Sequence, residues 1–224
     1  MEEIKLRIKN MNKKYNDNII FDNFDIEFDV NKVNCIVGKS GCGKSTLLNI
    51  VSGIVKNDSE DFKTMEDLGI SYIFQEDRLI EWLNVEENIK FVLDKKYKKE
   101  VLERKLQDYL DLAGIIQYKK YYPQMLSGGI RQRVNIVRAL IYPSKVIIMD
   151  EPFKSIDIKN KNIIMEKLKY ILKKEVRTVL FVTHDIDEAL FIADKIYVLG
   201  GSPVKVKGVL DNNSIDKNAI TDLI

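Results

Sequence analysis

The spacing of hydrophobic residues changes several times along the chain, and each spacing predicts a different element. Apolar and acidic residues alternate from Phe24 to Val30, which is typical of a strand with one buried face. Residues 33–37, 146–149 and 179–182 are instead almost continuously apolar, as expected for strands buried on both faces. Further strands are predicted at residues 70–74 and 195–199, with an edge strand around Val204, Val206 and Val209.

Apolar residues at helical spacing fill the intervals between these strands. The strand at 33–37 is followed by Leu47, Leu48, Ile50, Val51 and Ile54, which predict a helix. Two more helices are predicted, at residues 163–172 and through Ala189 and Ile192. Strands that alternate with helices predict an α/β fold with a mostly parallel sheet covered on both faces.

One helical and highly charged stretch, from about residue 85 to about residue 140, interrupts this alternation. We interpret it as a lobe inserted into the core. The expected organisation is a single domain at 1–224, with a core at about 1–84 and 141–210, a helical lobe at about 85–140 and a short tail at 211–224.

Composition narrows the class of protein. Hydrophobic residues make up 45% and charged residues 31% of the chain, and the net charge of +2 gives no strong field that favours nucleic acid. The acidic start at Met1–Lys5 is unlike a signal peptide, and no apolar run reaches the roughly 18 residues needed to span a bilayer. Cys35 and Cys42 fit neither a disulfide framework nor a metal site. We therefore expect a cytosolic chain.

Residues 38–45 match the phosphate-binding motif G-x-x-x-x-G-K-[ST] in full, and they follow a predicted strand and precede a predicted helix. Such a loop points its backbone N–H groups at phosphate oxygens, and the helix adds its positive end. Lys44 is expected to reach the phosphates and Ser45 to ligate Mg²⁺. The predicted nucleotide contacts are Gly38, Lys39, Ser40, Gly41, Cys42, Gly43, Lys44, Ser45 and Thr46. Two explanations of Cys42 are open: the loop needs a small side chain at this position, or the thiol acts as a redox sensor.

Two acids, Asp150 and Glu151, stand at the end of the apolar strand 146–149. Ligand sites of open α/β sheets occupy the carboxyl edge of the strands. We expect Asp150 to hold Mg²⁺ and Glu151 to polarise an attacking water. The alternative is an acid pair that caps a helix.

Two more polar side chains follow predicted strands at the same edge. His184, the one histidine of the chain, comes shortly after the strand at 179–182, and it is a candidate for a hydrogen bond to the γ-phosphate. Gln75 follows the strand at 70–74 and is a candidate contact to Mg²⁺ or to water. Taken alone, a lone histidine is more often structural, and a lone glutamine is a weak signal.

The segment Leu126-Ser127-Gly128-Gly129 precedes a predicted amphipathic helix and is a second anion-binding helix start in the same chain. Together with the motifs above and Ser155-Ile156-Asp157, it resembles the signature of ABC ATPases, and the resemblance covers nearly the whole chain. It implies the ABC ATPase fold: a P-loop NTPase core with N-terminal antiparallel strands and an inserted helical lobe.

The resemblance also implies partners and roles. Two ATPase subunits, expected to be a homodimer, would face each other with ATP between the phosphate loop of one and the signature of the other. Ser127, Gly128 and Gly129 would then contact ATP bound to the partner, and Asp157 would couple the two sites. Tyr15 would stack on adenine; a surface tyrosine near a strand is the alternative.

The segment 74–89 is similar to that of importers of nitrate, sulfonate, taurine and related compounds, although Glu81 stands where relatives usually have proline. This implies a cytoplasmic subunit at the membrane face, bound to transmembrane permease subunits and working with a solute-binding protein. Trp82 is either part of the permease contact or a core residue of the lobe. An exporter or lipoprotein-release ATPase is the nearest alternative. DNA-repair and translation-associated ABC proteins would normally carry a coiled coil, a zinc insertion or a second cassette, which the sequence lacks.

Overall fold

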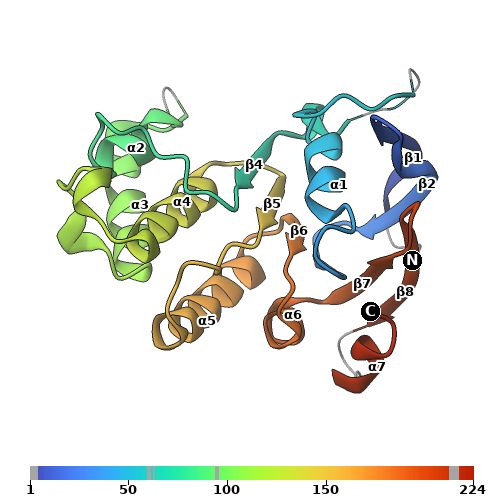
Figure 1. Ribbon diagram of the computed structural model, residues 1–224. Helices are drawn as coiled ribbons and strands as arrows, with labels where there is room; N and C mark the ends of the chain where they lie inside the picture. The colour runs from blue at the N-terminus through green and yellow to red at the C-terminus, as the bar shows by residue number, and fades with distance from the viewer. Residues whose placement is uncertain (1–4, 60–61, 63, 94–95, 212–216) are drawn as a thin grey trace.

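The computed structural model describes residues 5–59, 62, 64–93, 96–211 and 217–224. Part of the predicted tail, residues 212–216, lies outside the described residues. The chain folds into a long N-terminal hairpin, a larger sheet with helices on both faces, and a group of helices beyond one end of that sheet (Figure 1).

The larger sheet has the strand order β4-β5-β6-β3-β7-β8. Its parallel strands are β3 (Val33–Val37), β4 (Ile70–Ile73), β5 (Val146–Asp150), β6 (Thr178–Val182) and β7 (Lys195–Gly200). Among the described strands of this sheet, only β8 (Lys205–Asp211), at one edge, runs antiparallel, and it pairs with β7. The prediction of a mostly parallel sheet with an edge strand after residue 204 is confirmed.

The N-terminal strands β1 (Lys5–Tyr15) and β2 (Asn18–Asp29) pair antiparallel as a separate sheet. The alternation seen from Phe24 to Val30 puts Phe24, Ile26 and Phe28 into the interior, because successive strand residues face opposite sides. They pack with α1 (Lys44–Val51) over one face of the larger sheet.

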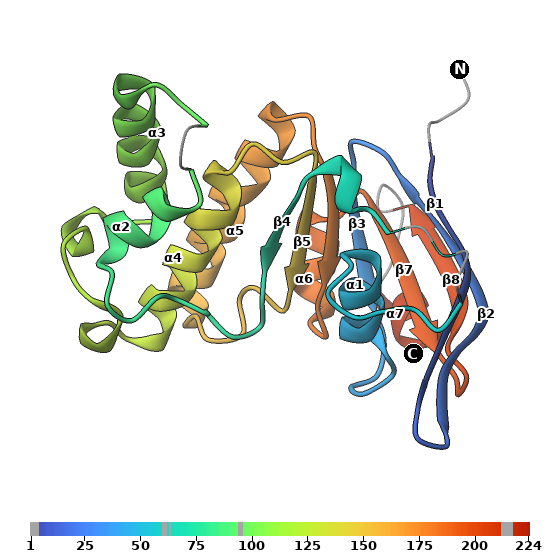
Figure 2. The ribbon, with the colours of Figure 1, turned by 90° about the horizontal axis from the view of Figure 1, so that it is seen from above.

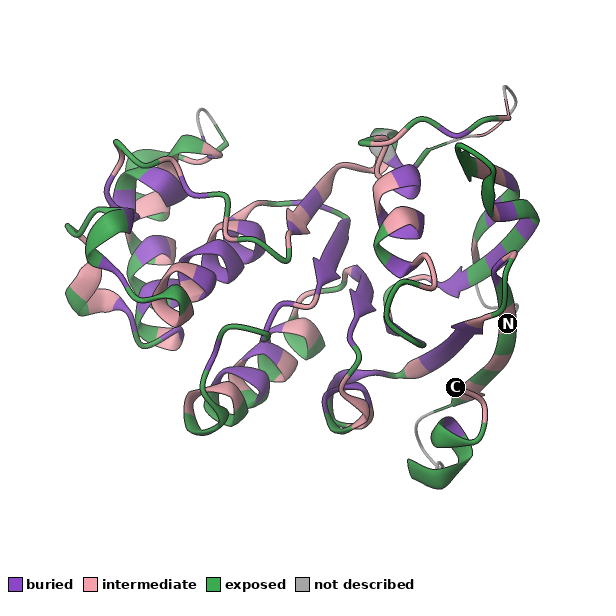
Figure 3. Cartoon of the chain, viewed as in Figure 1, coloured by how far each residue is buried: buried purple, intermediate pink, exposed green. Residues whose placement is uncertain are grey.

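The continuously apolar strands contribute side chains to two hydrophobic cores, one on each face of the sheet. In β5, Val146 and Ile148 pack against α1 and the N-terminal hairpin, whereas Ile147 and Met149 pack against the helices of the opposite face. Figure 3 shows these central strands as buried along their length. Because both faces are covered, the strands lack the alternation that marks β2.

The opposite face carries α5 (Ile158–Lys174) and α6 (Ile186–Ile192), and α7 (Lys217–Thr221) packs beside α6. Beyond β4 lie α2 (Val85–Phe91), α3 (Lys99–Leu112) and α4 (Gly128–Ile141), with short 3₁₀ turns at Ile116–Tyr118 and Pro123–Met125 (Figure 2). Another 3₁₀ turn, at Glu66–Leu68, precedes β4 and packs on the side of the sheet that carries α1. α2 begins with a capping box between Asn84 and Glu87. This helical region is in the expected part of the chain, and the exact domain boundaries stay a prediction.

Three local predictions are corrected. The helix after the phosphate loop ends at Val51 rather than reaching Ile54, which is exposed, because the chain turns at Gly53. Gly128 and Gly129 form the first turn of α4 instead of preceding it. Trp82 is not a core residue of the lobe, since 79% of its surface is exposed.

Candidate functional site

The phosphate loop joins β3 to α1 at the carboxyl edge of the larger sheet. Gly43 begins the helix with a φ of 102°, and a Cβ there would lie 2.9 Å from Ile20 Cγ2. A Cβ on Gly38 would lie 2.3 Å from the Leu199 carbonyl oxygen. The two motif glycines are therefore required both by backbone conformation and by close packing.

Lys44 lies across this loop. Its Nζ donates to the carbonyl oxygens of Gly38 and Lys39, each at 2.8 Å, and the residue is only 6% exposed. Cys42 Sγ lies 3.8 Å from the same Nζ. The ammonium group is thus held within the loop, where a phosphate would meet it together with backbone N–H groups.

Asp150 ends β5 and is buried. Its Oδ1 has no hydrogen-bond partner. Burial raises the pKa of the Asp150 carboxyl, and the charge of Glu151 adds to this, while the Ser45 hydroxyl and Lys44 act in the opposite direction. A buried carboxylate oxygen without a partner is costly, so Asp150 and Ser45 fit a cation at this point.

Glu151 follows with a left-handed backbone, φ 46°, a conformation that costs on the order of 1–3 kcal/mol and that clusters at functional sites. Its Oε1 lies 3.0 Å from His184 Nδ1, and its Oε2 accepts from Gln75 Nε2 at 3.3 Å. Lys154 Nζ lies 3.3 Å from Oε2. Burial acts to raise the pKa of Glu151, but the hydrogen bonds from His184 and Lys154 outweigh it and hold the pKa below its ordinary value. The carboxylate is therefore ionised at neutral pH.

The structure brings Gln75, Glu151 and His184 together, although 76 residues separate the first two. Lys154, which shares the Glu151 carboxylate, is not among the residues that the sequence predicted for the site. The spacing of three residues between Glu151 and Lys154 is the signal that could have found it. The alternative that the acid pair caps a helix is not what the structure shows, because α5 is capped by Asp157 instead.

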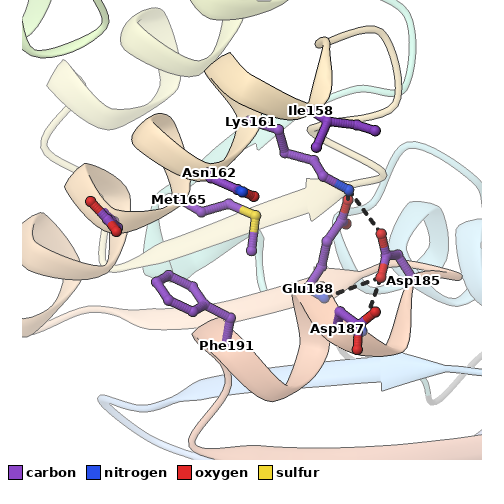
Figure 4. Close-up of a pocket in the computed structure, with 9 residues that line it drawn as sticks. Ile158, Lys161, Asn162, Met165, Asp185, Asp187, Glu188 and Phe191 are labelled. Carbon is purple, nitrogen blue, oxygen red and sulfur yellow. Dashed lines mark hydrogen bonds and ion pairs between the residues drawn. The ribbon is translucent and has the colours of Figure 1, made fainter.

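His184 lies between β6 and α6, with 59% of its side chain exposed. Its neighbours are fixed: Thr183 Oγ1 donates to Glu188 Oε2 at 2.6 Å, and Asp185 caps α6 by accepting from Asp187 N and Glu188 N. From α5, Lys161 binds both Asp185 and Glu188, as Figure 4 shows. The histidine therefore projects from a turn whose two flanks are held by hydrogen bonds.

The signature residues start α4, which packs on the face of the sheet opposite α1. Ser127 occupies the N-cap position and is exposed, and its side chain makes no capping hydrogen bond. A Cβ on Gly128 would meet open space, whereas one on Gly129 would lie 3.1 Å from the Ser155 carbonyl oxygen. Ser127 and Gly128 thus present an open helix start, while Gly129 allows close packing on the segment before Asp157.

Two remaining predicted residues lie apart from this cluster. Tyr15 ends β1 and is 47% exposed, with Lys13 Nζ 5.4 Å from its ring centroid. Asp157 is exposed at the start of α5, where its side chain accepts from Asn160 N at 3.1 Å. Both side chains are accessible to a ligand or a second chain.

The phosphate loop, the signature segment and the pair Asp150–Glu151 all lie within the residues that one family model matches. The family model described as ABC transporter matches residues 21–154, more than half of the chain. The chain belongs to the ABC transporter family.

Curated relatives of this ABC chain extend beyond the matched region. The aliphatic sulfonates import ATP-binding protein SsuB of Bacillus thuringiensis subsp. konkukian is 35% identical over 201 residues, which cover 87% of this chain and 79% of the relative. An ABC transporter ATP-binding protein of Methanocaldococcus jannaschii is 35% identical over 222 residues, covering 93% of this chain and 82% of the relative.

Solved structures agree with this assignment. A dimeric bacterial ABC transporter cassette is 29% identical, has a TM-score of 0.82 and covers 95% of this chain and all of its own. The same cassette in a dimeric post-hydrolysis state, bound to ADP and Pi, has a TM-score of 0.80. The predicted ABC ATPase fold is confirmed, and this ABC chain is an ATP-binding ATP hydrolase. Among the described residues, no helix is both long and apolar enough to cross a membrane.

Proposed function

We propose that this chain powers the import of a small solute of the nitrate, sulfonate or taurine type by hydrolysing ATP at the cytoplasmic face of a membrane. The observation that carries the hydrolytic part is the Glu151 carboxylate, which Gln75 and His184 hold at the carboxyl edge of the sheet, one residue from Asp150. The importer part is supported by relatives named as aliphatic sulfonate import proteins.

In the proposed reaction, Lys44 and the loop from Gly38 to Thr46 bind the phosphates, and Tyr15 stacks on adenine. Mg²⁺ would be held by Ser45, Asp150 and Gln75, and it would neutralise charge on the phosphate oxygens. No group of three or more His, Cys, Asp or Glu side chains forms a metal cage in the described part of the chain. A site with few protein ligands is ordinary for Mg²⁺, because this ion keeps several waters and also uses substrate phosphates as ligands.

Glu151 then orients the attacking water and accepts its proton. The ionised state of its carboxylate suits this role, because an acceptor must be unprotonated before the step begins. His184 shares the carboxylate through Nδ1 and would bond the γ-phosphate. The negative charge of Glu151 next to the γ-phosphate is unfavourable, and the positive charges of Lys44 and Lys154 offset this repulsion.

The complete site requires two chains. Ser127 and Gly128 are open to solvent in one chain, and α4 and α1 lie on opposite faces of its sheet. A second copy, arranged head to tail, would bring its Ser127, Gly128 and Gly129 to the γ-phosphate, with Asp157 near the contact. The solved cassette is dimeric, which supports a second chain in the assembly.

The segment after Gln75 is proposed to contact the permease. Asn88 holds it in place: its Oδ1 accepts from Ile80 N at 2.8 Å, and its Nδ2 donates to the carbonyl oxygen of Leu83 at 2.8 Å. Trp82 and Glu81 are exposed on the outside of this fixed segment. An ordered segment that exposes an indole and a carboxylate suits a protein partner with a basic helix.

Glu81→Lys is expected to leave folding and ATP binding intact and to weaken assembly with the permease. The loss should be partial and should decrease as salt is raised, because exposed charge pairs contribute only about 0–1 kcal/mol and are screened. Co-purification of wild type and variant with the permease, at low and moderate salt, measures it. Asp108→Lys, which reverses an exposed acid in the middle of α3, is the matched control. Equal recovery of wild type and Glu81→Lys at both salt concentrations would refute the proposal that Glu81 makes an electrostatic contact with the permease.

Import itself is tested in liposomes that contain the complete transporter. With ATP on the side of this subunit and a solute-binding protein on the other, we expect the loaded binding protein to stimulate hydrolysis and a labelled sulfonate or nitrate to accumulate on the ATP side. Movement of a solute or lipoprotein away from the ATP side would instead identify an exporter or a release system and refute the proposal.

A further inference from the structure

A lysine on α5 connects that helix to the turn that carries His184. Lys161 Nζ donates to Asp185 Oδ2 at 2.8 Å and to Glu188 Oε1 at 2.9 Å, and its side chain is 18% exposed. Figure 4 shows this contact at one end of a cavity of about 440 Å³ between α5 and α6. Lys161 belongs to none of the motifs that the sequence contains.

The two carboxylates that Lys161 binds hold the backbone on both sides of His184. Glu188 Oε2 accepts from Thr183 Oγ1, the residue before the histidine, and Asp185 is the residue after it. Asp185 N also donates to Thr183 Oγ1 at 3.0 Å, which closes the turn. A displacement of either carboxylate is therefore transmitted to the imidazole.

We propose that Lys161 is a positioning residue for His184, acting through Asp185 and Glu188, and that it links the imidazole to the start of α5. Lys161 lies one helical turn after Asp157, and its N–H donates to the Asp157 carbonyl oxygen at 2.8 Å. Asp157 in turn follows the segment on which Gly129 packs. The start of α4, the start of α5 and His184 thus form one connected path.

A purely structural role is the competing explanation, because any ion pair between α5 and α6 contributes to stability. The chain offers a matched control for it. Lys169, two helical turns further along α5, also reaches α6: its Nζ donates to the Phe191 carbonyl oxygen and lies 4.8 Å from the Phe191 ring centroid. Lys169 joins the same two helices at the end away from His184.

The first measurement reads His184 directly. The chain contains one histidine, so tag-free protein labelled with ¹³C in the imidazole gives a single histidine signal. Lys161→Met is expected to shift or broaden this signal, Lys161→Arg to leave it close to wild type, and Lys169→Met to leave it unchanged. If Lys161→Met does not fold, Lys161→Gln takes its place.

The second measurement is the rate of ATP hydrolysis. Lys161→Met should lower kcat about 10-fold to 100-fold, because the His184 imidazole would be displaced from the position it needs for the reaction. KM should change little, because the residues that bind ATP stay in place. Lys161→Arg should restore most of the rate, and Lys169→Met should stay within about 2-fold of wild type, as for a surface change outside the network.

An imidazole signal that is the same in wild type and Lys161→Met would overturn the proposal, as would an equal shift caused by Lys169→Met. The rate effect rests on the proposed role of His184, whereas the imidazole signal does not. A shifted signal with an unchanged kcat would therefore support Lys161 as a positioning residue and would refute the catalytic role of His184.

Discussion

Glu151→Gln is expected to lower the rate of ATP hydrolysis about 10²-fold to 10⁴-fold, the range typical of a lost general base. The amide keeps the shape of the side chain and can still contact Gln75 and His184, which bond the carboxylate in the wild type. It cannot take a proton from water. It also removes a negative charge near the γ-phosphate, so ATP should stay bound.

Because bound ATP would hold the two chains together, Glu151→Gln should accumulate as a closed dimer. Gel filtration with ATP and Mg²⁺ should show a doubled mass, which reverts when nucleotide is removed. A Glu151→Gln protein that hydrolyses ATP at the wild-type rate would exclude Glu151 as the base.

Lys44→Ala is the contrasting variant for this experiment. Lys44 is buried in the phosphate loop and its Nζ bonds two loop carbonyl oxygens, so its loss removes a cation from the phosphates. A charge-assisted hydrogen bond contributes about 1.5–3 kcal/mol, so ATP affinity should fall by about 10-fold to 100-fold. Hydrolysis should then be lost without a stable dimer, which separates failure to bind ATP from failure to cleave it.

Much of the fold could be predicted because local patterns report local burial. The apolar runs at 33–37 and 146–149 became β3 and β5 with the expected bounds to within one residue. The phosphate loop was predictable for the same reason, since its motif is continuous in sequence and lies between a buried strand and a helix. The carboxyl edge was also predictable, because parallel strands end on the same side of a sheet.

Contacts between distant segments were less predictable. Nothing local indicates that Gln75 contacts the Glu151 carboxylate, or that Lys161 binds Asp185 and Glu188. These pairs depend on how β4, β5 and α6 are placed by the whole sheet. Trp82 was ambiguous for a related reason: its exposure depends on Asn88, which fixes the segment 80–84 by hydrogen bonds that hydrophobic spacing does not reveal.

Ser127→Arg is the second variant with a large expected effect. In one chain Ser127 is exposed at the N-cap of α4 and makes no capping bond, so the substitution should leave the fold and ATP binding to the same chain intact. At the proposed dimer contact, however, the arginine would fill the space meant for the γ-phosphate and remove a donor. Loss of one such transition-state contact costs about 10²-fold to 10³-fold in kcat.

The central claim is that each hydrolytic site is built from two chains, and a mixing experiment tests it most directly. A subunit carrying both Glu151→Gln and Ser127→Arg spoils both sites of any dimer it joins, one through each substitution. Mixed in equal amounts with wild type, and with random pairing verified by native mass spectrometry, it should leave about one quarter of the wild-type rate at the same total concentration, since only the dimers with two wild-type chains are active. A rate of about one half, proportional to the wild-type fraction alone, would show that each chain hydrolyses ATP by itself and would contradict the account.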